Sequence, residues 1–148
     1  MVGTQTRKPL WRCPKCGHRF VTRNLWHSCG RYSLADHFKG KAKSLRKTFD
    51  QFVRIARNCG SVTVYAQKSR IVLQSRVRFA SAIVHPDWLE ANLWLKRRVK
   101  HPLLYRTEDL RPLGYGTHFR LRIPEEVDGS IVDWMHEAYA IGRQEQFE

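Results

Sequence analysis

The sequence feature that most constrains the fold is a cluster of cysteines near the N-terminus. Cys13 and Cys16 form a Cys-x-x-Cys pair followed by Gly17, and one residue separates His27 from Cys29. A Cys-x-x-Cys turn directs two thiolates at one ion, and a glycine after it tolerates the left-handed backbone that lets amides approach sulfur. In extended backbone, residues i and i+2 point to the same side, so the second pair can reach the same metal. The sequence therefore predicts one structural zinc ion held by Cys13, Cys16, His27 and Cys29.

Three thiolates and one imidazole complete a four-coordinate shell and leave no open position for a catalytic water. A disulfide would leave one of these three cysteines unpaired and would need an oxidising compartment. His18 and His37 are the alternative fourth ligands, but His18 lies too close to Cys16 to chelate easily, and His37 falls at the entry to the first predicted helix. Cys59 is expected to be a small buried residue at a helix end.

The charge of the chain is strongly positive and unevenly distributed. The sequence holds 27 lysines and arginines against 13 acidic residues, a formal net charge of +14. Residues 1–60 carry 14 basic and 2 acidic side chains, whereas residues 123–148 carry 1 and 7. A cationic body of this kind favours a polyanionic partner, and nucleic acid, either DNA or RNA, is the partner expected. A solvated basic surface without a dedicated ligand is the alternative.

The sequence predicts neither a membrane span nor a secretory signal. No segment approaches the roughly 20 apolar residues that cross a bilayer, and the basic residues before Leu10 precede no apolar run. We therefore expect a cytoplasmic protein without a membrane partner, whose thiols stay reduced and available to a metal.

Hydrophobic periodicity divides the remaining chain into helices and strands. Ser44–Cys59 places apolar residues at the three- and four-residue steps of one helix face, with Ser44 as its expected N-cap. The period then changes to two, which predicts a short strand over Ser61–Gln67, a turn at residues 68–70 and a longer strand over Ile71–Val84.

Three further elements complete the pattern. Residues 89–96 alternate as a half-buried strand, for which a helix starting at Asp87 is the alternative. A last strand has Phe119, Leu121 and Ile123 inward, and a helix capped by Asp128 spans Gly129–Gly142. The expected fold is α+β: an N-terminal zinc knuckle or ribbon in residues 1–36, then an antiparallel β-meander packed on two helices in residues 37–148.

The outward positions of the predicted strands are basic, with one tryptophan among them. If the strands share a sheet in phase, their uncovered face offers guanidinium groups to phosphates and an indole to bases. Coverage of that indole by a loop or by the N-terminal segment is the alternative. Phosphate contacts are expected more than base reading, because nothing resembles the recognition helix of a two-cysteine, two-histidine finger. The expected nucleic-acid-binding residues are Arg12, Lys15, Arg19, Arg23, Lys41, Lys43, Arg76, Arg78, Trp94, Arg120 and Arg122.

Several short segments carry a resemblance to a known family. They are residues 10–17 (LWRCPKCG), 25–29 (LWHSC), 37–41 (HFKGK), 68–71 (KSRI), 93–98 (LWLKRR) and 137–139 (EAY). From about Leu10 to Gln144 the chain resembles a bacterial family of domains of unknown function, number 5655, in its zinc-finger-bearing form. The resemblance implies a small α/β domain after a zinc finger, in a setting where related domains are joined to restriction- or nuclease-like proteins. It implies no catalytic residue.

An enzyme is the weaker hypothesis. The best pool of acid–base groups is His85, Asp87, His101, Glu108, Asp109 and His118. No spacing among them matches a nucleophile elbow, a metallohydrolase helix or a phosphate-binding loop. We therefore expect a non-enzymatic, zinc-containing basic protein that binds the phosphate backbone of nucleic acid without sequence specificity. The alternatives are an adaptor or small-ligand domain that recognises an acidic partner, and an accessory of a nuclease or restriction system.

Overall fold

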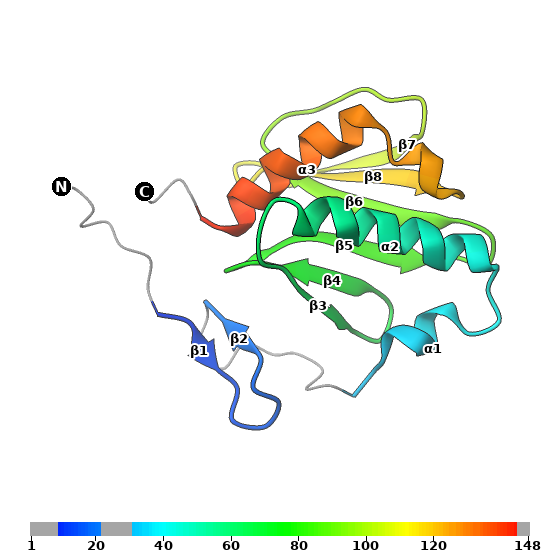
Figure 1. The fold of residues 1–148 in the computed structure, drawn as a ribbon. Coiled ribbons are helices and arrows are strands. Elements are labelled where there is room, and N and C mark those ends of the chain that lie inside the picture. Colours follow the sequence, from blue (N-terminus) through cyan, green and yellow to red (C-terminus); the bar gives the residue numbers. More distant parts are fainter. Residues whose placement is uncertain (1–8, 22–30, 145–148) are drawn as a thin grey trace.

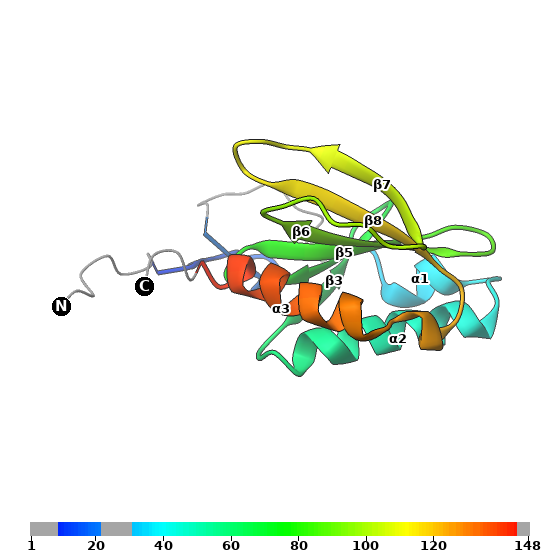
Figure 2. The ribbon, with the colours of Figure 1, turned by 90° about the horizontal axis from the view of Figure 1, so that it is seen from above.

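The main body is an antiparallel sheet with two long helices on one face. The computed structural model describes residues 9–21 and 31–144. Figures 1 and 2 show α2 and α3 side by side against the same face of the sheet. The elements in chain order are β1 (Trp11–Arg12), β2 (Arg19–Phe20), α1 (Leu34–Phe38), α2 (Lys43–Arg57), β3 (Thr63–Ala66), β4 (Ile71–Gln74), β5 (Arg78–Val84), β6 (Leu89–Leu95), β7 (Leu104–Asp109), β8 (Tyr115–Leu121), the 3-10 turn η2 (Pro124–Glu126) and α3 (Gly129–Gly142).

The six strands of this sheet run antiparallel in the order β3-β4-β5-β6-β8-β7. The predicted α+β class and antiparallel sheet are confirmed, but the strands do not form a simple meander, because β8 lies between β6 and β7. The burial of the two strands explains why β8, and not β7, pairs with β6. Phe119 and Leu121 of β8 are fully buried, whereas Tyr105 and Arg106 of β7 are exposed and tolerate the edge of a sheet.

The core lies between the sheet and the two long helices. Phe49 and Phe52 of α2, together with Ile131 and Met135 of α3, are at most 1% exposed. The facing sheet surface combines the small side chains of Ala80, Ala82 and Ala91 with the large ones of Leu93 and Phe119, and all of them are buried against the helices. Among the helices of residues 9–21 and 31–144, none combines the length and apolarity needed to cross a bilayer.

The N-terminal hairpin of β1 and β2 packs on the opposite face of the sheet. Its Phe20 is 2% exposed, and the ring of His18 meets that of Tyr65 edge-on, with centroids 4.0 Å apart. The Gln74 side-chain amide donates to the Arg19 carbonyl oxygen at 2.5 Å. Tyr65 and Gln74 lie on the sheet face that the long helices leave open, so the hairpin covers the β3–β4 end of that face.

The single strand predicted over Ile71–Val84 is wrong. The segment forms two strands, β4 and β5, joined by a turn at residues 75–77. Apart from Ser75, this turn contains none of the residues that usually mark one. Instead, the backbone N–H groups of Arg76 and Val77 both donate to the carbonyl of Gly142, each at 2.9 Å. The turn is therefore held by a distant helix, which a local pattern does not reveal.

The other predicted elements are close to the observed ones. α3 spans the predicted residues, and the Asp128 side chain accepts a hydrogen bond from the Ile131 N–H at 3.1 Å. α2 begins at Lys43 after Ala42, so Ser44 is not its N-cap. Residues 89–95 form strand β6, and the alternative of a helix there is wrong.

Two details at element ends also differ from the prediction. Ile123 was expected to point inward, but β8 ends at Leu121 and Ile123 is 46% exposed. The short helix α1 was missed, although Ser33 and Asp36 form a reciprocal capping box at its start. That box is a sequence signal, but only five residues follow it, too few to establish a helical period.

Candidate nucleic-acid interface

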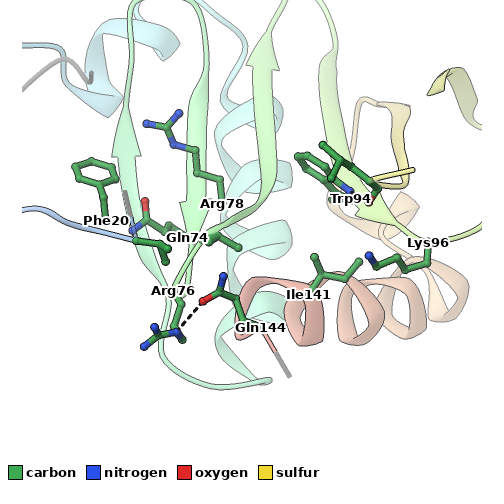
Figure 3. Close-up of a pocket in the computed structure, with 11 residues that line it drawn as sticks. Phe20, Gln74, Arg76, Arg78, Trp94, Lys96, Ile141 and Gln144 are labelled. Carbon is green, nitrogen blue, oxygen red and sulfur yellow. Dashed lines mark hydrogen bonds between the residues drawn. The ribbon is translucent and has the colours of Figure 1, made fainter. Parts of the chain in front are cut away.

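A hollow of about 330 Å³ lies between the N-terminal hairpin and the end of the main sheet. We call it the Trp94 pocket. It is lined by Phe20 and Val21 of the hairpin segment, by Gln74, Arg76, Val77 and Arg78 around the β4–β5 turn, by Trp94, Lys96 and Leu113, and by Ile141 and Gln144 at the end of α3. Figure 3 shows Phe20 and Arg78 on one side and Trp94 and Lys96 on the other. The described lining thus combines two aromatic rings and three cations with no carboxylate.

A hydrogen bond at the edge of the indole ring holds Trp94 in place. The indole Nε1 donates a hydrogen bond to the Leu113 carbonyl at 3.0 Å. Gly114 follows with a φ of +130°, and a Cβ atom there would lie 2.5 Å from the Leu95 carbonyl oxygen and 2.8 Å from the indole nitrogen. Only glycine combines this backbone angle with so close an approach. The ring therefore keeps one orientation on the half-buried wall of the pocket.

Arg78 is held between two aromatic rings. Its guanidinium carbon lies 5.7 Å from the ring centroids of both Phe20 and Tyr65, and its Nε donates to the Tyr65 hydroxyl. Burial raises the pKa of Tyr65 more than Arg78 and Arg70 lower it, so the hydroxyl stays protonated at neutral pH. The Nη2 atom of Arg78 is buried and has no hydrogen-bond partner among the described residues. It is a buried charged donor whose hydrogen-bonding capacity the described residues leave unsatisfied.

Arg76 and Lys96 complete the cationic rim. The Nε of Arg76 donates to the Gln144 side-chain oxygen at 3.0 Å, the contact dashed in Figure 3. Lys96 follows β6 and is exposed. The pocket brings together three residues expected to bind nucleic acid, Arg76, Arg78 and Trp94. The sequence analysis did not place Phe20 or Lys96 there, because their positions depend on how the hairpin docks and where β6 ends.

The described half of the predicted zinc site has the backbone of a two-thiolate turn. Gly17 N–H donates to the Cys13 carbonyl and Cys13 N–H to the His18 carbonyl, both at 2.8 Å, and the φ of Gly17 is +77°. Cys13 is buried and Cys16 is exposed. This donor pair and this turn fit zinc. His27 and Cys29 lie outside the described residues, and within residues 9–21 and 31–144 no group of three or more potential metal ligands is found.

The two alternative histidine ligands make other contacts. The His18 ring stacks on Phe20 with centroids 4.5 Å apart, and His37 Nε2 lies 2.7 Å from the Gln67 carbonyl oxygen. Cys59 is half-buried at the end of α2, where its thiol donates to the Ile55 carbonyl at 3.4 Å.

The remaining expected binding residues do not join the Trp94 pocket. Arg12, Lys15 and Arg19 are exposed on the hairpin, Lys41 and Lys43 lie at the start of α2, and Arg23 lies outside the described residues. Arg122 is exposed beyond the end of β8. The guanidinium carbon of Arg120 lies 4.4 Å from the Trp88 ring centroid and 4.8 Å from that of Tyr105. The Arg120 guanidinium therefore packs on the rings of Trp88 and Tyr105, outside the Trp94 pocket.

The open sheet face is not one continuous basic floor, because a carboxylate–histidine network occupies its middle. Glu90 and His118 are both 4% exposed. Glu90 carboxylate oxygens lie 2.9 Å from His85 Nε2 and 2.7 Å from His118 Nδ1, and Glu108 lies 2.6 Å from the other ring nitrogen of His118. Arg106 contacts both carboxylates, at 3.3 and 3.6 Å. Within this network, the two carboxylates share Arg106 as their cationic partner.

This network contains half of the acid–base pool that the sequence suggested. His85, Glu108 and His118 come together, and the sequence analysis missed their buried partner Glu90. Burial raises the pKa of Glu90, but the hydrogen bond from His85 and the charges of His118 and Arg106 outweigh it, so the pKa lies below that of an ordinary glutamate. The other members of the pool lie apart. His101 pairs with Asp128 at 2.8 Å, Asp109 pairs with Arg111 at 2.7 Å, and Asp87 is exposed in a turn.

Comparison with known proteins identifies the main body. The family model for a domain of unknown function (DUF5655) matches residues 34–142. No curated protein and no solved structure matches the chain. The matched segment runs from the start of α1 to the end of α3 and so contains the whole six-stranded sheet. On this match, the chain belongs to the DUF5655 family.

Proposed function

We propose that this protein binds nucleic acid at the Trp94 pocket and along the exposed cations of the adjoining hairpin. The observation that carries the proposal is the chemistry of the described pocket lining: Phe20 and Trp94 with Arg76, Arg78 and Lys96, and no acidic side chain. Cations supply the electrostatic attraction that dominates binding to phosphates, and aromatic rings accept stacked bases. The pocket joins both functions within one hollow.

The hairpin contributes exposed positive charge beside this hollow. Arg12, Lys15 and Arg19 are all exposed, and Arg19 immediately precedes the pocket residue Phe20. In such a site the cations position the phosphate backbone and the bases are not read by sequence. The proposal is therefore one of non-specific binding by a protein without catalytic activity.

The proposal includes one structural zinc ion in the N-terminal hairpin. Cys13 and Cys16 would hold it with His27 and Cys29, and the ion would supply folding free energy to a segment too short to build its own core. Support comes from the turn at Cys13–Gly17 and from the contact of His37 Nε2 with the Gln67 carbonyl oxygen, which occupies one of the two alternative histidines. The expected effect of the zinc on binding is indirect, through the position of Phe20.

The proposal is tested by the salt dependence of binding and by charge reversal. Affinity of the full chain for labelled DNA and RNA oligonucleotides should fall at least tenfold between about 50 and 200 mM salt. A protein carrying both Arg76→Glu and Lys96→Glu should lose at least tenfold in affinity at 50 mM salt. Lys47→Glu is the control, because this exposed lysine lies on α2, on the other side of the sheet.

Two results would contradict the proposal. One is the absence of salt-sensitive binding to either nucleic acid. The other is an equal loss in the Lys47→Glu control, which would mean that only the net charge of the protein matters. Recovery of an acidic protein after nuclease treatment, in place of nucleic acid, would point to the adaptor function.

A further inference from the structure

We infer that the Trp94 pocket receives one unpaired base, so that the protein binds single-stranded nucleic acid in preference to duplex. The inference deepens the proposed function and rests on it. It names the conformation of the ligand, whereas the electrostatic argument alone applies to single strands and duplexes alike.

The first argument is the shape of the site. The aromatic rings line a recessed hollow of about 330 Å³, a volume at the lower end of the range of small-molecule sites. A base inside a duplex is stacked on both faces and paired along its edge, so it enters such a hollow only after leaving the helix. An unpaired base on a flexible strand avoids most of that cost. The recess therefore favours single strands.

The second argument is the orientation of Trp94. Its edge is bonded to the Leu113 carbonyl, and Gly114 backs the indole closely. Because the ring is already ordered, a base that stacks on it does not have to immobilise it first. A duplex offers a stacking face only at its ends, so this preorganised surface contributes little to duplex binding.

The third argument concerns the charges around the ring. Arg76, Arg78 and Lys96 lie around the same hollow as Trp94, close enough to contact the phosphates that flank an inserted base. The buried Nη2 of Arg78 has no hydrogen-bond partner among the described residues. Buried charged donors are normally satisfied, and a base carbonyl or a phosphate oxygen would satisfy this one.

The fourth argument is the geometry that duplex recognition would need. Proteins read the major groove with a helix or a two-stranded ribbon that protrudes into it. The described elements at the pocket rim are the two-residue strand β2, the β4–β5 turn, the end of β6 and the C-terminal end of α3. The basic outer face of α2 lies on the opposite side of the sheet. Apart from the short β1–β2 hairpin, which packs on the sheet through the buried Phe20, no element of the described rim is placed to enter a groove.

The experiment compares three probes on the unaltered protein at one salt concentration. They are a single-stranded DNA oligonucleotide, the duplex of the same sequence, and an abasic strand of the same length that keeps the phosphates but lacks the bases. We expect the single strand to bind at least tenfold more tightly than either of the others. The abasic probe isolates the contribution of the bases without altering the fold.

Substitution at the pocket gives the second measurement. Trp94→Ala should lower single-strand affinity about tenfold and leave duplex affinity unchanged, and Trp94→Phe should lose less because it keeps a ring. Tyr105→Ala removes an aromatic side chain that is 43% exposed outside the pocket and should leave both affinities unchanged. Circular dichroism and thermal melting check that each variant is folded.

The outcomes separate the inference from the proposed function. Equal affinity for all three probes, with salt-sensitive binding still lost in the Arg76→Glu, Lys96→Glu protein, would overturn the single-strand preference and leave nucleic-acid binding standing. Tighter binding of the duplex would overturn it in the same way. Absence of binding to every probe would overturn both.

Discussion

Among single residues, Glu90 carries the largest set of buried electrostatic contacts in the described structure. Its carboxylate contacts His85, His118 and Arg106 on the open face of the sheet, and it is 4% exposed. Because these partners outweigh the cost of burial, its pKa is lower in the folded protein than in the unfolded chain. The ionised form therefore stabilises the fold, and the stabilisation depends on pH.

We predict that Glu90→Gln lowers the free energy of unfolding by about 1–3 kcal/mol at pH 7, because an amide carries no charge to pair with Arg106 and removes the carboxylate that contacts His85 and His118. The difference from the original protein should be complete above the pKa of a free glutamate, about 4.3. It should shrink as the pH falls through the lower folded-state pKa. Urea denaturation at several pH values measures it. Glu125→Gln, at an exposed glutamate, is the control, and a Glu90 effect that does not vary with pH would contradict the prediction.

Between elements, backbone hydrogen bonds connect the end of α3 to the β4–β5 turn. The Gly142 carbonyl accepts two backbone hydrogen bonds from that turn. A Cβ atom at Gly142 would lie 2.5 Å from the Phe79 ring. Because Phe79 is 1% exposed, its ring is packed on all sides and does not move away easily. This contact positions both the turn and the end of the helix, which together form one wall of the Trp94 pocket.

We predict that Gly142→Ala destabilises the protein by about 1 kcal/mol. Overpacking a core usually costs about 1–3 kcal/mol, and the preference of helices for alanine, about 1 kcal/mol, offsets only part of that cost. Gly129→Ala is the matched control at the start of the same helix, where no atom lies within 4 Å of the added methyl group. Chemical denaturation compares the two variants, and equal stabilities would show that Phe79 accommodates the change.

The elements that the sequence predicted well are those with a long local period. Helix α3 and strand β6 bury one face along their whole length, so their spacing alone identifies them. The β4–β5 turn was missed because a carbonyl of α3 holds it. Strand β7 was not predicted, because its largely exposed residues impose no strict alternation. The first error comes from a contact between residues far apart in the sequence, and the second from the weak pattern of an edge strand.

The residues of the candidate site were likewise predicted where the local period decides their position and missed where distant contacts decide it. Alternation along β6 placed Trp94 on the open face correctly, and the pocket places it beside Arg76 and Arg78. Arg120 pairs with Glu90 in the sheet and lies on the same open face, but it stays outside the pocket because its guanidinium packs on Trp88 and Tyr105. Membership of Phe20 in the pocket was beyond prediction, since it requires docking of the N-terminal hairpin on the sheet.

At the scale of the whole molecule, the acidic end of the chain contributes no charge to the described lining of the Trp94 pocket. The described acidic residues near the C-terminus, from Glu125 to Glu137, lie in η2, in α3 or, for Asp128, at the N-cap of α3, and therefore in the helical layer. The residues that this end of the chain contributes to the Trp94 pocket, Ile141 and Gln144, are uncharged. The acidic C-terminal segment seen in the sequence thus leaves the described lining of the pocket free of carboxylates.

Phe20 couples the N-terminal hairpin to the proposed binding site, because it is buried in the hairpin contact with the sheet and also lines the Trp94 pocket. If zinc holds the hairpin, its loss removes one wall of the pocket.

We predict one zinc ion per chain by metal analysis. We also predict that Cys16→Ser, or chelation, removes it, exposes the N-terminal segment to protease and lowers single-strand affinity. The body formed by residues 34–142 should keep its circular dichroism spectrum, and Cys59→Ser, at the end of α2, should change none of these properties. A metal-free protein with a protease-resistant N-terminus and unchanged affinity would exclude zinc as the staple of the hairpin.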